Sequence, residues 1–241
     1  MAIRPTAAAE LPLQNAIFPP TETRRRDLCT ECNRSRESCF CKYTKPFATN
    51  TRFLILMHPR EFKRQRTGTG RVTRKSLVNS EIFVGVDFTH DERLNRYLSD
   101  ESFFPVLLFP GEQAIPADSA EIRSAAAERQ LIVIILDATW ASARKMLNSS
   151  RNLQRLPRTS FEPGGASRFA IKRQPQAVCL STIEAVYRLL DIFDRNGIEH
   201  LRGTHAALME TLDAIVQFQL QCAADPALPS HRLNSKQTLI I

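Results

Sequence analysis

The run Leu131-Ile132-Val133-Ile134-Ile135-Leu136 is an unbroken aliphatic stretch that passes directly into Asp137-Ala138-Thr139-Trp140. Short runs rich in β-branched residues are typical of a strand buried on both faces at the centre of a parallel sheet. The run is far shorter than the roughly 20 residues that a membrane-spanning helix needs. Asp137 therefore stands at the carboxyl end of a buried strand, where open α/β sheets bind their ligands.

Similar apolar runs lie on both sides of this strand and alternate with amphipathic segments. We predict further strands at residues 53–57, 82–88 and 104–109, and one near 168–172. We predict helices at residues 72–79, 91–98, 119–129, 140–148, 181–195 and 199–222. Alternation of strands and helices on this scale indicates an α/β fold with a mostly parallel sheet.

Four of the six cysteines form the pattern Cys29-x2-Cys32-x6-Cys39-x1-Cys41. Four thiolates at this spacing suit a tetrahedral zinc ion without an open coordination position, and the polar stretch around them is too short to build its own core. We therefore predict a structural zinc site. Two disulfides, a redox-active pair and an iron–sulfur centre are the alternatives. Cys179 and Cys222 are expected to be buried apolar residues.

The chain carries a formal net charge of +8. An excess of Lys and Arg favours a polyanionic partner such as RNA, and a basic surface that serves only solubility is the alternative. The segment Thr67-Gly68-Thr69-Gly70, within the most basic part of the chain, is a candidate phosphate cradle. The predicted RNA contacts are His58, Arg60, Lys63, Arg64, Arg66, Arg71, Arg74, Arg155 and Arg158.

The sequence divides into a flexible leader (1–26), a zinc-binding module (27–46), a main α/β domain (47–223) and an irregular C-terminal tail (224–241). No segment has the pattern of a secretion signal or a membrane span, so we expect a cytoplasmic protein that has no membrane contact. The oligomeric state is open, with a monomer as the favoured expectation.

The segment Asp137-Ala138-Thr139-Trp140 matches the D-x-T-W signature of the DTW-domain family, which the chain resembles over about residues 27–222. The cysteine cluster, His58-Pro59-Arg60-Glu61, the segment 67–70 and Leu180-Ser181-Thr182-Ile183-Glu184-Ala185 follow in the order seen in that family. The resemblance is to its bacterial tRNA-uridine aminocarboxypropyltransferases. It implies a SPOUT-like catalytic domain with a C-terminal knot, which the strand pattern alone does not indicate.

The resemblance also implies a reaction. The 3-amino-3-carboxypropyl group of S-adenosylmethionine would pass to N3 of a uridine in tRNA, the variable-loop U47, giving acp3U and methylthioadenosine. Asp137 is then the predicted catalytic residue, as the base that removes the imide proton or as the group that orients the uridine. The alternative is that Asp137 caps the helix that begins near Thr139.

The predicted contacts to S-adenosylmethionine come from three places in the chain. They are Leu108, Phe109, Pro110 and Gly111 after a strand, Thr139 and Trp140 beside Asp137, and Ser181, Thr182 and Glu184 at a helix N-terminus. Each group also has a purely structural interpretation. The strand-end loop fits an ordinary turn, Trp140 fits a core position, and Ser181 with Glu184 fits a capping box.

Two other functions fit parts of the sequence. An S-adenosylmethionine-dependent RNA methyltransferase would use the same architecture, because the orientation of the cofactor decides which carbon meets the nucleophile. A non-catalytic zinc protein that binds RNA would account for the charge and the cysteines alone.

Overall fold

A parallel sheet forms the centre of the molecule. The computed structural model describes residues 29–32, 34–64, 68–169 and 179–225. Within them the strands run in the order β2-β1-β5-β3-β6-β4, and every neighbouring pair is parallel. The predicted α/β fold with a mostly parallel sheet is thereby confirmed. The strand bounds are β1 Arg52–Met57, β2 Ser80–Val84, β3 Phe103–Leu108, β4 Ile115–Pro116, β5 Gln130–Asp137 and β6 Arg158–Ser160.

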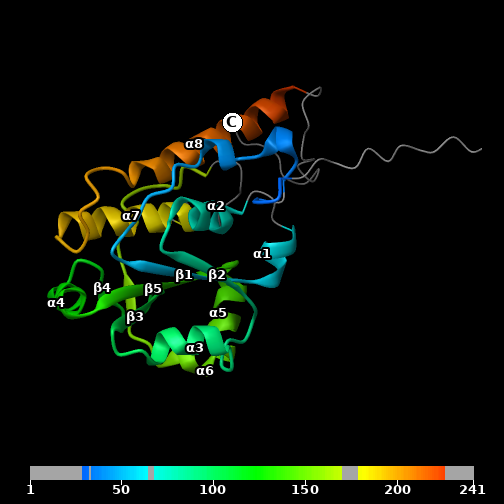
Figure 1. The fold of residues 1–241 in the computed structure, drawn as a ribbon. Coiled ribbons are helices and arrows are strands. Elements are labelled where there is room, and N and C mark those ends of the chain that lie inside the picture. Colours follow the sequence, from blue (N-terminus) through cyan, green and yellow to red (C-terminus); the bar gives the residue numbers. More distant parts are fainter. Residues whose placement is uncertain (1–28, 33, 65–67, 170–178, 226–241) are drawn as a thin grey trace, which may run out of the picture.

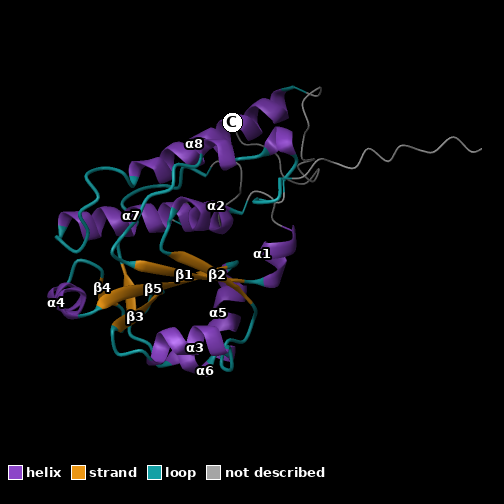
Figure 2. Ribbon diagram, viewed as in Figure 1, coloured by secondary structure: helices purple, strands orange, loops and turns teal. Residues whose placement is uncertain are grey.

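Helices cover both faces of this sheet (Figure 1 and Figure 2). One face carries α2 (Thr69–Ser76), α7 (Thr182–Arg195) and α8 (Ala206–Ala224). The other carries α3 (Glu92–Ser99), α5 (Trp140–Ser149) and α6 (Arg151–Gln154). The remaining helices are α1 (Pro59–Arg64) after β1, α4 (Ala120–Glu128) beside β4, and the short 3-10 helices η1 (Arg36–Ser38) and η2 (Cys41–Tyr43).

Alternation of side chains along the central strands builds one apolar core on each face. Val133 and Ile135 belong to the core that contains the apolar residues of α7 and α8. Ile132 and Ile134 belong to the core that contains those of α5. Because alternate side chains of a strand point to opposite faces, Asp137 continues the row of Val133 and Ile135 and faces α7.

The chain changes its winding direction between β1 and β5. After β1 it enters α2 on one face of the sheet, and after β5 it enters α5 on the other face, although β1 and β5 are neighbours. Their connections therefore leave the sheet in opposite directions. Open α/β sheets bind ligands at such a switch point, outside the carboxyl ends of the strands. Asp137, the last residue of β5, lies at this point.

The N-terminal cysteine segment shares the core of the main domain. Cys29, Cys32 and Phe40 belong to the same apolar cluster as the buried residues of α7 and α8. The hydroxyl of Thr211 in α8 donates a hydrogen bond of 3.0 Å to the carbonyl oxygen of Tyr43. The segment predicted as a zinc-binding module is therefore packed on α8.

Two predicted strands differ from the structure. The strand predicted at 82–88 is β2, which begins earlier and ends at Val84, because its partner β1 ends at Met57, the residue that pairs with Val84. The first two residues of the strand predicted at 168–172 lie in an irregular segment, so the prediction is wrong there. Its remaining residues lie outside the described ranges.

Two predicted helices have other bounds. The helix predicted at 72–79 is α2, which begins earlier and ends before Leu77, because Leu77 forms a β-bridge with Phe47. The helix predicted at 199–222 is α8, which begins later, because Gly203 adopts a φ of 81° and turns the chain first. The short elements α1, α6, β4 and β6 are absent from the sequence prediction.

The other predicted helices agree with α3, α4, α5 and α7 within one residue at each end. α3 and α4 begin directly after the capping residues Asp91 and Ser119, whose side chains accept hydrogen bonds from the first helical turn. None of the helices in the described ranges is long and apolar enough to cross a membrane. The predicted leader and nearly all of the predicted tail lie outside those ranges, as do residues 170–178, so the knot stays a prediction.

Candidate functional site

The side chain of Asp137 lies between the N-termini of two helices. It is 8% exposed, and its Oδ1 accepts a hydrogen bond of 2.6 Å from the hydroxyl of Thr182, the first residue of α7. On another side stands Gly70, in the first turn of α2. Helix N-termini carry a partial positive charge and stabilise an anion placed beside them. The fold therefore holds Asp137 as an oriented acid at the end of β5.

Gly70 allows α2 to approach this carboxyl group. A Cβ on Gly70 would lie 2.2 Å from Oδ2 of Asp137 and 2.9 Å from Cε of Met57, far inside normal contact distances. Only glycine avoids this collision. The sequence presents residues 67–70 as a candidate phosphate cradle, but Thr69 and Gly70 are buried in α2, and Gly70 packs on Asp137.

Thr139, and not Asp137, caps α5. The Thr139 side chain accepts a hydrogen bond of 3.3 Å from the backbone N–H of Ser142, in the first turn of the helix. The interpretation of Asp137 as a capping residue is therefore wrong, because Asp137 is the last residue of β5 and its Oδ1 binds α7.

His58 follows β1 and is joined to Asp137 through the backbone. Its N–H donates a hydrogen bond of 3.1 Å to the carbonyl oxygen of Asp137. Its ring Nδ1 accepts one of 3.1 Å from the N–H of Arg60, so a neutral ring carries its proton on Nε2. Burial, followed by the charges of Arg60 and Lys145, lowers the pKa of His58 below 6.5. The imidazole is therefore uncharged at neutral pH.

An aromatic group follows the carboxyl ends of β3 and of β5, the strand that ends at Asp137. Trp140 is 41% exposed, and its ring meets Phe109 edge-on with 5.9 Å between the centroids. The guanidinium of Arg158 lies 6.0 Å from the Phe109 centroid, and Gly111 is next to it. Two predicted cofactor contacts, Phe109 and Trp140, thus come together with a predicted RNA contact. The flanking residues are Leu108, the half-buried last residue of β3, and Pro110, which is exposed.

The carboxylate of Glu184 is buried and binds protein groups. It accepts hydrogen bonds from the backbone N–H of Ser181 (2.8 Å), from the hydroxyl of Ser167 (2.8 Å) and from the backbone N–H of Arg168 (2.6 Å). Ser181 and Glu184 form the capping box that the sequence indicates. Glu184 therefore fastens the segment before α7 to the first turn of that helix.

The loop Pro163-Gly164-Gly165 lies against α7. A Cβ on Gly164 would lie 2.8 Å from Nη2 of Arg188, and the φ of 71° at this position also favours glycine. A cavity of about 410 Å³ opens beside the loop, between Ser160, Glu162 and α7. This loop is thus packed on the helix whose first residue binds Asp137.

The predicted RNA contacts form two groups on opposite sides of β5 in the sheet. Those of the α1–α2 segment are His58, Arg60, Lys63, Arg71 and Arg74, and those of the α6–β6 segment are Arg155 and Arg158. The side chain of Arg64 and the whole of Arg66 lie outside the part of the chain that the structure describes.

Phe62, in α1, is not among the site residues predicted from the sequence. Its side chain is 38% exposed, and the guanidinium of Arg71 lies 4.1 Å from its ring centroid. Arg71 also donates a hydrogen bond to the Phe62 carbonyl oxygen. The signal available in the sequence is an aromatic residue inside the basic run of α1.

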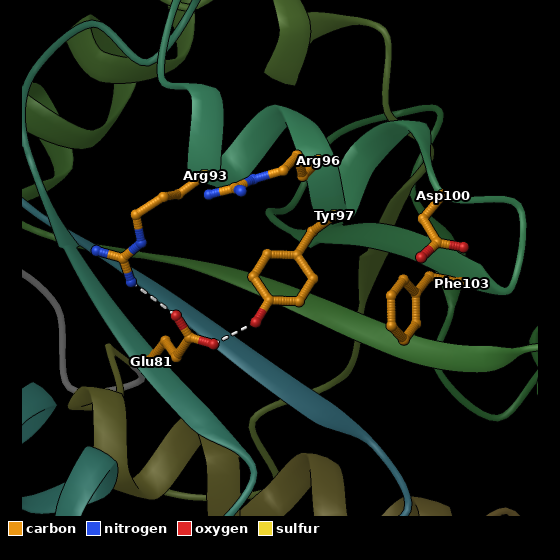
Figure 3. A pocket seen from close by; sticks show the side chains of 6 residues that line it. All are labelled: Glu81, Arg93, Arg96, Tyr97, Asp100 and Phe103. Atoms are coloured by element: carbon orange, nitrogen blue, oxygen red, sulfur yellow. Dashed lines mark hydrogen bonds and ion pairs between the residues drawn. The ribbon is translucent and has the colours of Figure 1, made fainter.

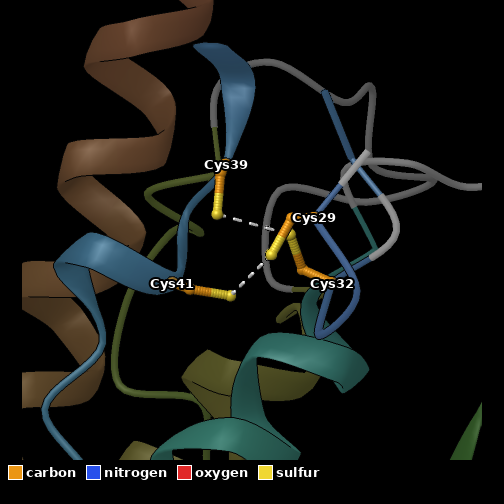
Figure 4. A group of neighbouring side chains, drawn as sticks. All are labelled: Cys29, Cys32, Cys39 and Cys41. Atoms are coloured by element: carbon orange, nitrogen blue, oxygen red, sulfur yellow. Dashed lines mark hydrogen bonds between the residues drawn. The ribbon is translucent and has the colours of Figure 1, made fainter. Parts of the chain in front are cut away.

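The four N-terminal cysteines converge on one point (Figure 4). Their Sγ atoms all lie within 4.8 Å of one another, with 3.9 Å between Cys29 and Cys41 and 3.6 Å between Cys32 and Cys39. A tetrahedral zinc ion with Zn–S bonds of about 2.3 Å requires Sγ–Sγ distances of about 3.8 Å. The donor set therefore fits zinc.

Local backbone groups favour a thiolate in this cluster. The backbone N–H groups of Cys32 and Glu31 lower the pKa of Cys29 to about 6, although burial opposes them.

All six cysteines lie in the described ranges and none forms a disulfide. Cys222 is buried, as predicted, and Cys179 is half-buried.

A smaller cavity of about 210 Å³ lies between β2 and α3 (Figure 3). Its acid, Glu81, accepts a hydrogen bond of 2.8 Å from Arg93 and another from the Tyr97 hydroxyl, and Arg52 is 3.7 Å away. Because the acid of this cavity is already paired with Arg93 and hydrogen-bonded to Tyr97, we interpret the group as a structural ion-pair network.

Comparison with known proteins identifies the family of the chain. A family model described as the DTW domain matches residues 26–220. The chain belongs to the DTW domain family. The D-x-T-W signature that defines the resemblance is the end of β5 and the start of α5, so it contains both Asp137 and the exposed Trp140.

Three relatives of this DTW protein cover most of its length. It is 26% identical to "tRNA-uridine aminocarboxypropyltransferase 2" of Mus musculus, over 90% of this chain and 71% of the relative. It is 29% identical to the protein of the same name in Drosophila melanogaster, over 83% and 78%. It is 26% identical to "tRNA-uridine aminocarboxypropyltransferase A" of Arabidopsis thaliana, over 89% and 90%. No solved structure matches the chain significantly.

Loss of the metal ligands should loosen the N-terminal segment of the DTW protein. Cys41→Ser removes one thiolate from the cluster, so zinc should be lost and the segment should become open to limited proteolysis. Cys222→Ser is the matched control, because Cys222 is also buried but lies outside the cluster. Metal analysis and proteolysis test this together. Full zinc content in Cys41→Ser, or loss of zinc in Cys222→Ser, would contradict the ligand assignment.

Removal of the Thr182 hydroxyl should destabilise the protein. Thr182→Val keeps the shape of the side chain and deletes the hydrogen bond to the buried Asp137 carboxyl group. We expect the free energy of unfolding to fall by about 1.5–3 kcal/mol, the usual value of a hydrogen bond to a charged group, in urea titrations. Thr182→Ser should retain most of the stability. Equal stabilities of the valine and serine variants would show that the bond contributes nothing.

The pKa of His58 should lie below 6.5 and should respond to Lys145. Lys145→Ala removes a positive charge that opposes protonation, so the His58 pKa should rise, whereas Lys45→Ala should leave it unchanged. Because the pKa of His58 is lower in the folded state than in the unfolded state, protonation of His58 opposes folding. The free energy of unfolding should therefore decrease as pH falls below 6.5. NMR titration of the imidazole measures the pKa, and an increase in the Lys45 variant alone would refute the role of Lys145.

Proposed function

We propose that this DTW protein is a tRNA-uridine aminocarboxypropyltransferase, which transfers the 3-amino-3-carboxypropyl group of S-adenosylmethionine to N3 of the variable-loop U47 and releases methylthioadenosine. The observation that carries the proposal is the Asp137 carboxyl group, which two helix N-termini hold at the switch point of the sheet beside an exposed tryptophan. Three relatives with that activity in their names support it. We further propose the SPOUT-like, knotted form of the α/β domain.

Bound S-adenosylmethionine would supply the aminocarboxypropyl carbon already activated by its sulfonium. The protein has to hold the uridine in line with that carbon and to accept the N3 proton as the N–C bond forms and the S–C bond breaks. Asp137 is suited to this work, because its Oδ1 is fixed by Thr182 and its orientation is therefore set before the substrate arrives. We propose that Asp137 either removes the proton from N3 or orients the uridine through a hydrogen bond at N3.

His58 is suited to a supporting role at the same edge. In its neutral form the ring presents Nε2–H, since Nδ1 accepts the hydrogen bond from Arg60. Loss of the N3 proton places negative charge on the carbonyl oxygens of uracil. A neutral donor such as Nε2–H stabilises that charge without adding a second proton to the site.

The residues that the sequence predicts as contacts of S-adenosylmethionine fall into two groups, those available to touch it and those that position other residues. Phe109, Pro110, Gly111, Thr139 and Trp140 are at least partly exposed at the strand ends and are available to touch it. The side chains of Ser181, Thr182 and Glu184 bind protein groups, so we assign them the positioning of Asp137 and of the segment before α7. Leu108, which is half-buried at the end of β3, belongs with the first group.

The remaining parts of the proposal concern the setting of this reaction. We propose that the partner is tRNA and that the protein is a cytoplasmic monomer. We propose a structural role for the zinc, because four thiolates leave no open coordination position. The catalytic domain spans residues 47–223, with the zinc-binding module at 27–46 and with the leader and tail outside both.

Asp137→Asn tests the proposal. The amide keeps the shape of the side chain but cannot take the proton, so the rate of transfer should fall by about 10²–10⁴-fold, the usual contribution of a general base. Asp100→Asn is the matched control, because Asp100 is an exposed acid in the turn before β3. The measurement is the nucleoside mass profile of tRNA incubated with protein and S-adenosylmethionine.

Each alternative gives a different mass profile. A gain of one methyl group would identify a methyltransferase, and an unmodified tRNA that is still bound by the protein would identify a non-catalytic RNA-binding protein. Either profile would overturn the proposed activity.

A further inference from the structure

Large apolar side chains that are exposed concentrate at one edge of the sheet. Within the described ranges, Phe62, Val84, Trp140 and Val78 are the large hydrophobic residues that are more than about a third exposed. Phe62 follows β1, Val84 ends β2 and Trp140 follows β5, so all three belong to the carboxyl edge. Val78 precedes β2 and belongs to the amino edge. The carboxyl edge thus exposes apolar surface where the candidate site lies, which is typical of an interaction surface.

Phe62 is fixed relative to Asp137 by the backbone. The N–H of Phe62 donates a hydrogen bond of 3.1 Å to the carbonyl oxygen of His58, and the N–H of His58 donates one of 3.1 Å to that of Asp137. Arg71 approaches the ring to 4.1 Å and also binds the Phe62 carbonyl oxygen. The ring is therefore held in place although 38% of the side chain is exposed.

The surroundings of the ring favour a nucleic acid over an apolar partner. Arg60 and Lys63 project from the same short helix and are exposed, and Arg71 lies on the ring itself. Phosphates bind to such cations, and unpaired bases stack on aromatic rings and on guanidinium planes. A protein partner with an apolar surface would bury these charges without compensation.

We infer that Phe62, together with Arg71, forms a stacking site for an unpaired nucleobase next to the uridine that would react at Asp137. The inference rests on the proposed function for the identity of the RNA, and it adds a contact that fixes how the loop enters. A single-stranded loop of RNA presents bases that stack in this way, whereas a base-paired stem does not. The site thereby selects uridines in loops over uridines in stems.

The test compares Phe62→Ala with Phe62→Trp and Phe62→Leu in the full-length protein. Base stacking is lost in the alanine variant, and a stacked base contributes about 5- to 150-fold to affinity for RNA. The leucine variant keeps apolar bulk without a flat ring and should be weakened in the same way, whereas the tryptophan variant should bind as wild type or better. Val78→Ala is the matched control, because it removes exposed apolar surface at the opposite edge.

Two measurements use these variants. Binding of a single-stranded oligouridylate is followed by fluorescence anisotropy at several salt concentrations, and loss of stacking should lower the affinity without changing the slope of log affinity against log salt. With tRNA as substrate, KM should rise in the alanine variant while kcat stays within a few-fold of wild type.

The outcomes separate this inference from the proposed function. Wild-type affinity in Phe62→Ala or Phe62→Leu would overturn the stacking site even if the protein forms acp3U. Weaker oligouridylate binding in both variants, with recovery in Phe62→Trp, would support it even if no aminocarboxypropyl group reaches tRNA.

Discussion

One buried hydrogen bond, from the Thr182 hydroxyl to the Asp137 carboxyl group, joins the two segments between which the candidate site is built. It ties the first residue of α7 to the last residue of the central strand β5, and Gly70 closes a third side by allowing α2 to reach the same group. The site thus depends on contacts among three elements that are far apart in the sequence. Displacement of any one of them would change the orientation of the acid.

The central strands could be predicted because their side chains are buried on both faces, which leaves a continuous aliphatic run in the sequence. The strands β4 and β6 have two and three residues, and polar residues and proline in them give no such signal. They form because the end of β3 offers backbone hydrogen-bonding groups to β6, and β6 offers its own to β4. Pairing with a neighbour, and not local composition, decides these elements.

The site divides in the same way. The cysteine cluster and the acid at the strand end could be predicted, because the spacing of ligands and the position after an apolar run are local properties. Three other features could not be predicted, since each depends on residues distant in sequence. They are the contact of Gly70 with Asp137, the groups around Glu184 and the exposure of Phe62. Glu184 illustrates the limit: its capping box is a local pattern of the sequence, and its bond to Arg168 is not.

The half-exposed indole of Trp140 has an optical consequence. It is the only tryptophan in the chain, and its ring meets Phe109 at the carboxyl edge of the sheet. Tryptophan fluorescence, excited at the long-wavelength edge of protein absorption, therefore comes from this single position. Any molecule that binds against Trp140 changes the polarity around that fluorophore, so the unlabelled protein carries its own reporter of binding at the candidate site.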